Sequence, residues 1–171
     1  MKKSVFTLLL LTIFSVTTYA QKFALIDMEY ILENIPAYEN ANQQLEQASK
    51  QWQAEIEKAG QEAKSLYESY QAAAKNLTET QRTQKENEIV EKEKSLAELR
   101  HKYFGPEGEL YKKREALIGP IQDQIYNAVK EIATQRGYAV VTDRASASSI
   151  IFASPEIDIS NEVLARLGYS N

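Results

Sequence analysis

The stretch YENANQQLEQASKQWQAEIEKAGQEAKSLYESYQAAAKNL, residues Tyr38–Leu77, decides the fold of this chain. Its apolar and small residues recur at steps of three and four, which is the seam of a coiled-coil helix. One additional step of four, from Trp52 to Ile56, is a stutter that locally unwinds the supercoil. At 1.5 Å per residue the helix would be roughly 57 Å long. The seam positions are Tyr38, Ala41, Leu45, Ala48, Trp52, Ile56, Ala59, Ala63, Leu66, Tyr70, Ala73 and Leu77.

The residues that follow predict a turn and a second helix that runs antiparallel to the first. Thr78 can accept from the backbone of Gln81 while the Gln81 side chain reaches back, which makes a capping box. Polar Arg82 and Lys85 occupy the seam nearest the turn, and the apolar positions beyond them are sparse: Ile89, Leu96, Leu99 and Tyr103. We therefore expect the tip of the arm to be polar, loosely packed and mobile.

Gly105-Pro106-Glu107-Gly108 interrupts the return helix, because proline and glycine both weaken the helical hydrogen-bond ladder. The apolar pattern resumes at Leu110 and continues to Ile132, so a kink is favoured over a domain boundary. Gly137 is expected to cap the end of the helix. The helical arm is thus predicted over residues 37–136.

Short apolar runs flank the arm and predict three strands, at Phe23–Ile26, Tyr138–Val141 and Ser149–Ala153. A last helix is expected over Asn161–Leu167, capped by Ser160. Three short strands make a poor independent sheet, and their edges invite pairing with another chain. We therefore predict an α+β fold. Its body, residues 21–36 and 137–171, is a small sheet or barrel completed by oligomerisation. The antiparallel coiled-coil hairpin is inserted between strands one and two.

Residues 1–20 have the organisation of a cleavable secretory signal peptide. Lys2 and Lys3 precede an apolar run over Val5–Val16, and Thr18-Tyr19-Ala20 places small residues as signal peptidase requires. The run is shorter than the ~20 apolar residues that span a bilayer. The chain contains no cysteine, so an exported form beginning at Gln21 would depend on packing or assembly for its stability.

Charge and motif content exclude several classes of function. Without Lys2 and Lys3 the chain is about six units negative, and residues 37–136 carry 15 basic and 17 acidic side chains, which predicts no nucleic-acid surface. No phosphate-binding glycine loop is present, and His101 is the only histidine. We therefore expect no nucleotide, metal, cofactor or catalytic residue. Asp27 and Asp143 could meet as an acid–base pair on parallel strands, although turn or cap roles are favoured.

Aromatic side chains within the arm allow two interpretations. They can pack the hairpin, or they can form an amphipathic lining that holds apolar clients weakly at many points. The candidates for client binding are Trp52, Tyr67, Tyr70 and Tyr103. The candidates for contacts between subunits are Phe23, Leu25, Val140, Ile150 and Ile151.

Four segments together resemble the Skp (OmpH) family of periplasmic chaperones. They are FALIDMEYIL at Phe23–Leu32, PIQDQI at Pro120–Ile125, GYAVVTD at Gly137–Asp143 and DISNEVL at Asp158–Leu164. The resemblance implies a trimer in which strands from three chains form a small barrel and three hairpins surround a cavity. It also implies that unfolded outer-membrane proteins are held there without ATP. The best-known member is strongly basic, whereas this chain is acidic, which leaves contact with lipopolysaccharide or the membrane open.

We therefore predict an ATP-independent periplasmic holdase that is not an enzyme. It would bind unfolded outer-membrane proteins between its helical arms and prevent their aggregation, with avidity supplied by many weak contacts. The alternative is a structural coiled-coil protein of the cell envelope that binds one fixed partner. The face of the arm that points inward depends on rotation about the seam and is left open.

Overall fold

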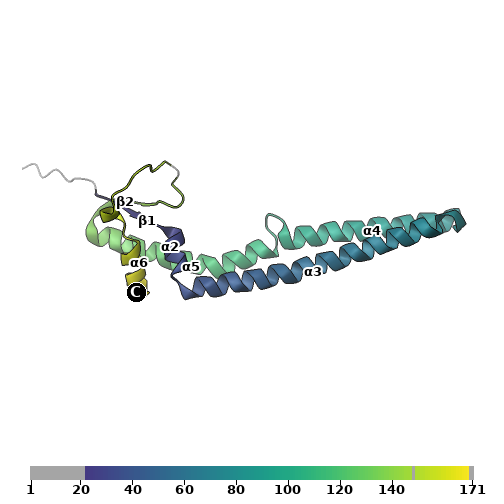
Figure 1. Ribbon diagram of the computed structural model, residues 1–171, viewed down its shortest axis with the longest axis horizontal. Helices are drawn as coiled ribbons and strands as arrows, with labels where there is room; N and C mark the ends of the chain where they lie inside the picture. The colour runs from purple at the N-terminus through teal and green to yellow at the C-terminus, as the bar shows by residue number, and fades with distance from the viewer. Residues whose placement is uncertain (1–21, 148, 170–171) are drawn as a thin grey trace, which may run out of the picture.

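The computed structural model describes residues 22–147 and 149–169 and consists of a small body with one long arm (Figure 1). The predicted signal segment and Gln21 lie outside the described residues. None of the described helices is both long enough and apolar enough to cross a membrane. The elements in chain order are β1 (Lys22–Ile26), α2 (Met28–Glu33), α3 (Pro36–Ala73), the 3-10 turn η1 (Ala74–Asn76), α4 (Glu79–Phe104), α5 (Glu109–Arg136), β2 (Tyr138–Asp143), the 3-10 turn η2 (Pro155–Ile157) and α6 (Ser160–Leu167).

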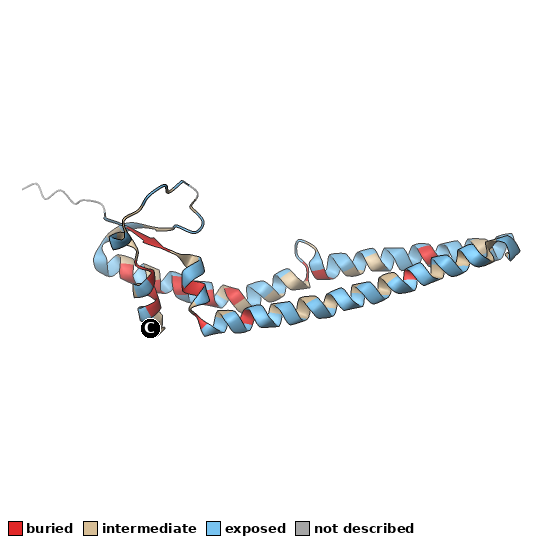
Figure 2. Cartoon of the chain, viewed as in Figure 1, coloured by how far each residue is buried: buried red, intermediate tan, exposed pale blue. Residues whose placement is uncertain are grey.

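The arm is the predicted antiparallel hairpin, with α3 as its continuous helix. α3 packs against α4 in the outer part of the arm and against α5 nearer the body (Figure 1). Every predicted seam position between Tyr38 and Ala73 is buried or half-buried, while most other positions of α3 are exposed (Figure 2). The heptad pattern therefore identified the packed face of α3 correctly.

The tip of the arm has the predicted capping box and the predicted polar seam. Thr78 accepts from the backbone N–H of Gln81 at 3.3 Å, and the Gln81 side chain accepts from the backbone N–H of Thr78 at 3.0 Å. Arg82 is half-buried and donates to the carbonyl oxygen of Ala74 at 3.3 Å, whereas Lys85 is exposed. The first buried apolar side chain of α4 is Ile89. The mobility of the tip stays a prediction.

The expected kink at Gly105–Gly108 is instead a complete interruption of the return helix. α4 ends at Phe104, α5 begins at Glu109, and the four residues between them form a loop that stands out from the arm (Figure 1). The N–H of Gly105 bonds to the carbonyl of His101 and the N–H of Gly108 bonds to the carbonyl of Gly105, both at 2.9 Å. The chain thus folds back on the last turn of α4 before it starts a new helix.

The body contains a parallel pair of strands. β1 pairs with β2 in a register that runs from Phe23 opposite Val140 to Ile26 opposite Asp143. The predicted third strand at Ser149–Ala153 is wrong, because these residues have no strand conformation in the described chain. The second edge of β1 instead receives Asp158, which bridges Leu25, and the N–H of Ile159 donates to the carbonyl of Leu25 at 2.9 Å.

The core of the body forms where α5 passes behind the two strands and meets α2 and α6. Its largest fully buried side chains are Ile31, Ile125, Ile132 and Val163. Gly137 ends α5 with φ of 71°, in the left-handed conformation predicted for its cap. Ser160 is the first residue of α6 and not its cap, since the N-cap position belongs to Ile159. The Asp158 carboxylate accepts from the N–H of Ser160 at 2.9 Å and so supplies the acceptor that a capping side chain would provide.

We expect Ile125→Ala to lower the free energy of unfolding by about 2–5 kcal/mol, because it leaves a cavity between α5 and the body. Urea unfolding followed by circular dichroism measures the loss. The control is Gln124→Ala, an exposed neighbour on the same helix, for which a change within about 0.5 kcal/mol is expected. Equal losses in the two variants would contradict the assigned packing of α5.

Candidate functional site

An aromatic cluster lies in the middle of the arm, where α4 gives way to α5. Trp52 of α3 stacks on Tyr103 of α4, with ring centroids 5.0 Å apart and an interplanar angle of 9°. Trp52 also meets Phe104 edge-on at 6.5 Å and 82°. Such pairs contribute about 0.5–1.5 kcal/mol each beyond the area that they bury. The cluster therefore holds the end of α4 against α3 at the level of the Trp52–Ile56 stutter.

Two of the predicted client-binding residues bond across the hairpin through their hydroxyl groups. The Tyr103 hydroxyl donates to Glu55 at 2.5 Å, and the Tyr70 hydroxyl donates to Glu86. These hydrogen bonds are the largest cause that raises the pKa of each tyrosine, followed by partial desolvation and the charge of the neighbouring carboxylate. Tyr103 is buried and Tyr70 is half-buried. Both side chains join α4 to α3.

The other two candidates are more accessible. Tyr67 is 48% exposed and its hydroxyl accepts from Gln71 at 2.9 Å, while Trp52 is half-buried in the aromatic cluster. The structure thus brings Trp52 and Tyr103 into contact and places Tyr67 and Tyr70 nearer the tip. Client binding by these four residues stays a prediction.

An ion pair adds a polar contact between the two helices of the arm. Lys92 of α4 donates to Glu62 of α3 at 2.8 Å. The hydrogen bond from Lys92, and then its charge, lower the pKa of Glu62. Because both side chains are about half exposed, such a pair contributes little to stability. Together with the tyrosine–carboxylate bonds it indicates that polar contacts supplement a thin apolar seam.

The predicted subunit contacts lie in different environments. Phe23 and Val140, which are paired in the strand register, are 53% and 47% exposed. Ile151 is fully exposed and Ile150 is half-buried, whereas Leu25 is buried within its own chain at 7% exposure. Phe152, 84% exposed, lies outside the predicted set, although it belongs to the same apolar run as Ile150 and Ile151. Their role between subunits stays a prediction.

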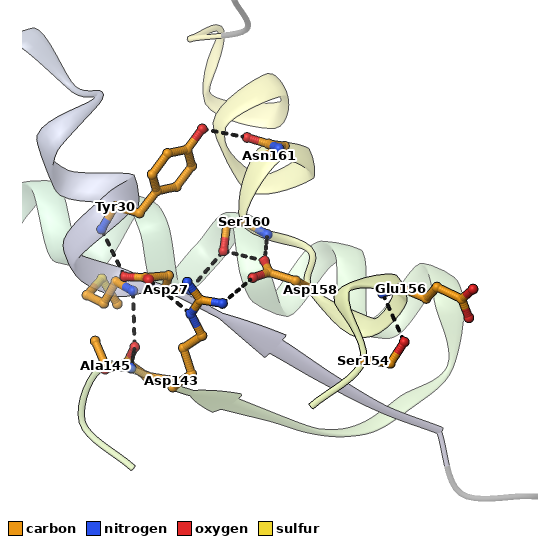
Figure 3. Close-up of polar contacts among 11 residues, drawn as sticks. Asp27, Tyr30, Asp143, Ala145, Ser154, Glu156, Asp158, Ser160 and Asn161 are labelled. Atoms are coloured by element: carbon orange, nitrogen blue, oxygen red, sulfur yellow. Dashed lines mark hydrogen bonds and ion pairs between the residues drawn. The ribbon is translucent and has the colours of Figure 1, made fainter. Parts of the chain in front are cut away.

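Asp27 and Asp143 have the cap and turn roles that the sequence favoured (Figure 3). Asp27 caps α2 by accepting from the N–H of Tyr30 at 3.0 Å, and its second oxygen accepts from Arg144 at 3.0 Å. Asp143 accepts from the backbone N–H groups of Met28 at 3.0 Å and Ala145 at 3.1 Å. Both carboxylates are therefore used to hold the ends of the strands.

The same polar cluster ties the C-terminal segment to β1 (Figure 3). The Ser160 hydroxyl accepts from the N–H of Asp27 at 2.8 Å and donates to Asp158 at 2.6 Å. Arg144 lies between the carboxylates of Asp27 and Asp158, at 3.0 Å and 3.6 Å. Among the residues described, no group of three or more histidine, aspartate or glutamate side chains could hold a metal ion. The cluster therefore has a structural role, which is to hold the C-terminal segment against the end of β1.

Hydrogen bonds make the ionised form of Asp143 the favoured one. Burial acts to raise its pKa, but the N–H of Met28, the Ser146 hydroxyl and the N–H groups of Ala145 and Ser146 outweigh burial and lower it. A lowered pKa means stability that is present above the unfolded value of about 3.9 and is lost as the pH falls through the folded value.

We therefore expect Asp143→Ala to lower the free energy of unfolding at pH 7 by about 1–3 kcal/mol, because two backbone donors lose their acceptor. The penalty should be smaller at pH 3 than at pH 7, because pH 3 lies below the unfolded value, where the stability contributed by the charge begins to be lost. Urea unfolding at both pH values measures the difference. Asp143→Asn, which keeps one acceptor oxygen, serves as the control. A penalty that is the same at pH 3 and pH 7 would contradict the role of the charge.

The loop between α4 and α5 requires glycine at its ends. A Cβ atom on Gly108 would lie 2.8 Å from the carbonyl oxygen of Tyr103 and 2.9 Å from that of Lys102. At Gly60, in the middle of α3, the nearest atom to a Cβ would be a methyl carbon of Leu96 at 3.9 Å, an ordinary contact. The two glycines therefore predict opposite effects of an added methyl group.

We expect Gly108→Ala to destabilise the arm by about 1–3 kcal/mol, since backbone atoms must move to admit the methyl group. Gly60→Ala should instead stabilise it by about 1 kcal/mol, because alanine is the better helix former. Thermal unfolding followed at 222 nm compares the two. A neutral Gly108→Ala variant would show that the loop is not folded tightly against α4.

Comparison with known proteins identifies the family. The family described as outer membrane protein (OmpH-like) matches residues 22–167. The chain is 25% identical over 155 residues to the chaperone protein Skp of Yersinia enterocolitica, with 90% of each chain covered. It is 24% identical over 148 residues to the chaperone protein Skp of Photorhabdus laumondii, with 86% of each covered. An OmpH-like crystal structure from Caulobacter crescentus CB15 has the same fold, with a TM-score of 0.66 at 12% identity over 86% of this chain and 83% of that one. The resemblance found in the sequence is confirmed, and the chain belongs to the OmpH-like family.

Proposed function

We propose that the protein is a periplasmic holdase chaperone that binds unfolded outer-membrane proteins between its arms, without ATP and without a catalytic step. The observation that carries the proposal is that the chain divides into a small body and a long helical arm. One small body supports a hairpin that runs from Pro36 to Arg136 and has a largely exposed surface (Figure 2). The relatives named chaperone protein Skp support the same function. Export by a cleaved segment over residues 1–20 belongs to this proposal.

We further propose that the working form is a homotrimer joined at the body. Phe23 and Val140 form an exposed apolar pair on the two-stranded sheet, and Ile151 and Phe152 project from the segment between β2 and η2. Removing such side chains from water contributes about 25 cal/mol per Å² of apolar area. In a trimer, residues 149–153 would supply a neighbouring sheet with the strand that they do not form within one chain. Ile150 and Leu25 would support the interface from behind.

Holding, in this proposal, results from many weak contacts along three arms. Each contact contributes little, but a client that touches several arms at once stays bound because rebinding is intramolecular. The polar tip and the loop at Gly105–Gly108 would let an arm adjust to clients of different size. The residues predicted from the sequence for these contacts are Trp52, Tyr67, Tyr70 and Tyr103.

We expect one trimer per client to keep an outer-membrane protein soluble when it is diluted from urea, with and without ATP alike. Light scattering measures aggregation, and multi-angle scattering after gel filtration measures the mass of the chaperone. Amino-terminal sequencing of the exported protein should begin at Gln21. The control is the same dilution with an equal mass of a folded protein that has no arms.

A monomer in solution, or a client that aggregates as fast as in the control, would count against the holdase. Stable binding of one envelope protein without any effect on aggregation would favour the alternative of a structural coiled coil with a fixed partner. The two functions therefore differ in a single set of measurements.

A further inference from the structure

The large apolar side chains that the arm leaves exposed between residues 37 and 111 share one position relative to the seam. Each follows a seam residue of its helix directly in the chain. Their exposed fractions are 48%, 58%, 39% and 51% for Tyr67, Val90, Phe104 and Tyr111. The seam residues that precede them are Leu66, Ile89, Tyr103 and Leu110, all of them buried or half-buried.

Helix geometry places these four side chains on the same edge of the hairpin. One residue advances about 100° around a helix of 3.6 residues per turn, so the residue after a seam position points sideways. In an antiparallel pair the second helix runs in the opposite direction and also faces the first helix from the opposite side. Each of these changes alone would move the residue after the seam to the other side of the pair, so together they leave it on the same side. The residue after the seam therefore points to the same side on both helices. We call the edge that carries Tyr67, Val90, Phe104 and Tyr111 the aromatic edge.

The opposite edge carries none of the large exposed apolar side chains of the described arm. The residues that precede the seam positions lie on this edge. Three of them make polar contacts with a side chain of the facing helix or of their own helix. Glu55 accepts from Tyr103, Glu62 pairs with Lys92, and the Lys102 ammonium lies 5.0 Å from the ring centroid of Tyr103. We call this the polar edge.

A contact on the aromatic edge agrees with the geometry. Gln71 follows the seam residue Tyr70 and bonds to the Tyr67 hydroxyl at 2.9 Å, so the two share an edge. Along α4 the same edge carries Thr83 and Ala97, which follow the seam residues Arg82 and Leu96, and also the charged Glu86 and Arg100, which follow Lys85 and Leu99. The exposed large apolar side chains of this part of the arm thus lie along one edge, whereas charged side chains occur on both edges.

We propose that the aromatic edge is the surface of the arm that contacts the client, and that its ligand is an extended, unfolded segment with alternating apolar side chains. This inference rests on the proposed holdase function and names the contact surface for it. The aromatic edge would then be the side of the arm that points toward the client, which the seam alone leaves open.

The spacing along the edge fits an extended chain. Val90 and Phe104 are fourteen residues apart on one helix, which corresponds to roughly 21 Å. An extended strand covers that distance in about six residues, and side chains six apart point the same way. Membrane-spanning strands of outer-membrane barrels alternate apolar and polar residues in this manner. One apolar face of such a segment can therefore meet successive points on the edge.

The exposed area is too small for a permanent contact with another copy of the chain. Aromatic side chains bury about 150–250 Å² each when fully covered. Half-exposed side chains at four separate points thus offer on the order of 400 Å², against about 800 Å² per partner in a stable interface. A surface of this size suits weak contacts that are made and released.

The chain offers matched positions for a direct test. Ser95 and Ala97 flank the seam residue Leu96, and Ser65 and Tyr67 flank Leu66; all four flanking residues are exposed. The protein has no cysteine, so a single introduced thiol carries a photo-crosslinker at one known place. The variants are Ala97→Cys against Ser95→Cys, and Tyr67→Cys against Ser65→Cys, each in the full-length protein with an outer-membrane protein diluted from urea.

We expect the yield of crosslinks to the client to be several-fold higher at positions 97 and 67 than at 95 and 65. Equal yields, or higher yields on the polar edge, would overturn the inference and leave the holdase function standing if the client stays soluble. Crosslinks at position 97 that join copies of this chain would overturn it as well, by assigning the edge to a subunit contact. A wild-type protein that fails to keep the client soluble would remove both proposals.

A second set of variants tests the contribution of the side chains themselves. Tyr67→Ser, Val90→Ser and Tyr111→Ser combined should weaken client affinity several-fold with helix content unchanged by circular dichroism. Phe104 is left in place because it contacts Trp52. The control combines Ser65→Ala, Ser69→Ala and Ser95→Ala on the polar edge. An affinity that is equal in the two combinations would overturn the inference.

Discussion

The parallel pairing of β1 with β2 is the constraint on which the rest of the structure depends. Strands that run in the same direction cannot be joined by a tight turn, so the chain needs a long crossover between Ile26 and Tyr138. In this protein almost the whole crossover is the arm, which leaves the body and returns to it. The pair is in turn held by α5 behind it and by the cluster of Asp27, Asp143 and Arg144 at the strand ends.

The arm is built with a thin seam and several departures from regularity. Trp52, Ile56 and the loop at Gly105–Gly108 lie at one level, where the stutter of α3 faces the change from α4 to α5. Because α4 and α5 are separate helices, each can take its own rotation against α3. Polar contacts such as that of Glu62 with Lys92 then help to orient the two helices where apolar contacts are few. An arm of this kind can be long and still be adaptable.

Most of the large apolar side chains that remain exposed fall into two groups. Phe23, Val140, Ile151 and Phe152 lie at the body, close to strand edges, where a second chain could cover them. Tyr67, Val90, Phe104 and Tyr111 are spread along one edge of the arm. The first group suits assembly, because it combines apolar surface with unpaired backbone groups. The second suits repeated weak contact, because its members are separated.

The sequence by itself determined the hairpin, its seam, the capping box at Thr78 and the left-handed Gly137, because periodicity and local hydrogen bonds act between residues that are near in the chain. It also carried the family resemblance. Only the tertiary structure decided that β1 receives Asp158 and not the run Ser149–Ala153, and that Tyr103 and Tyr70 bond to Glu55 and Glu86 across the arm. These outcomes depend on which distant segments meet and on rotation about the seam, and neither quantity is encoded in a local pattern.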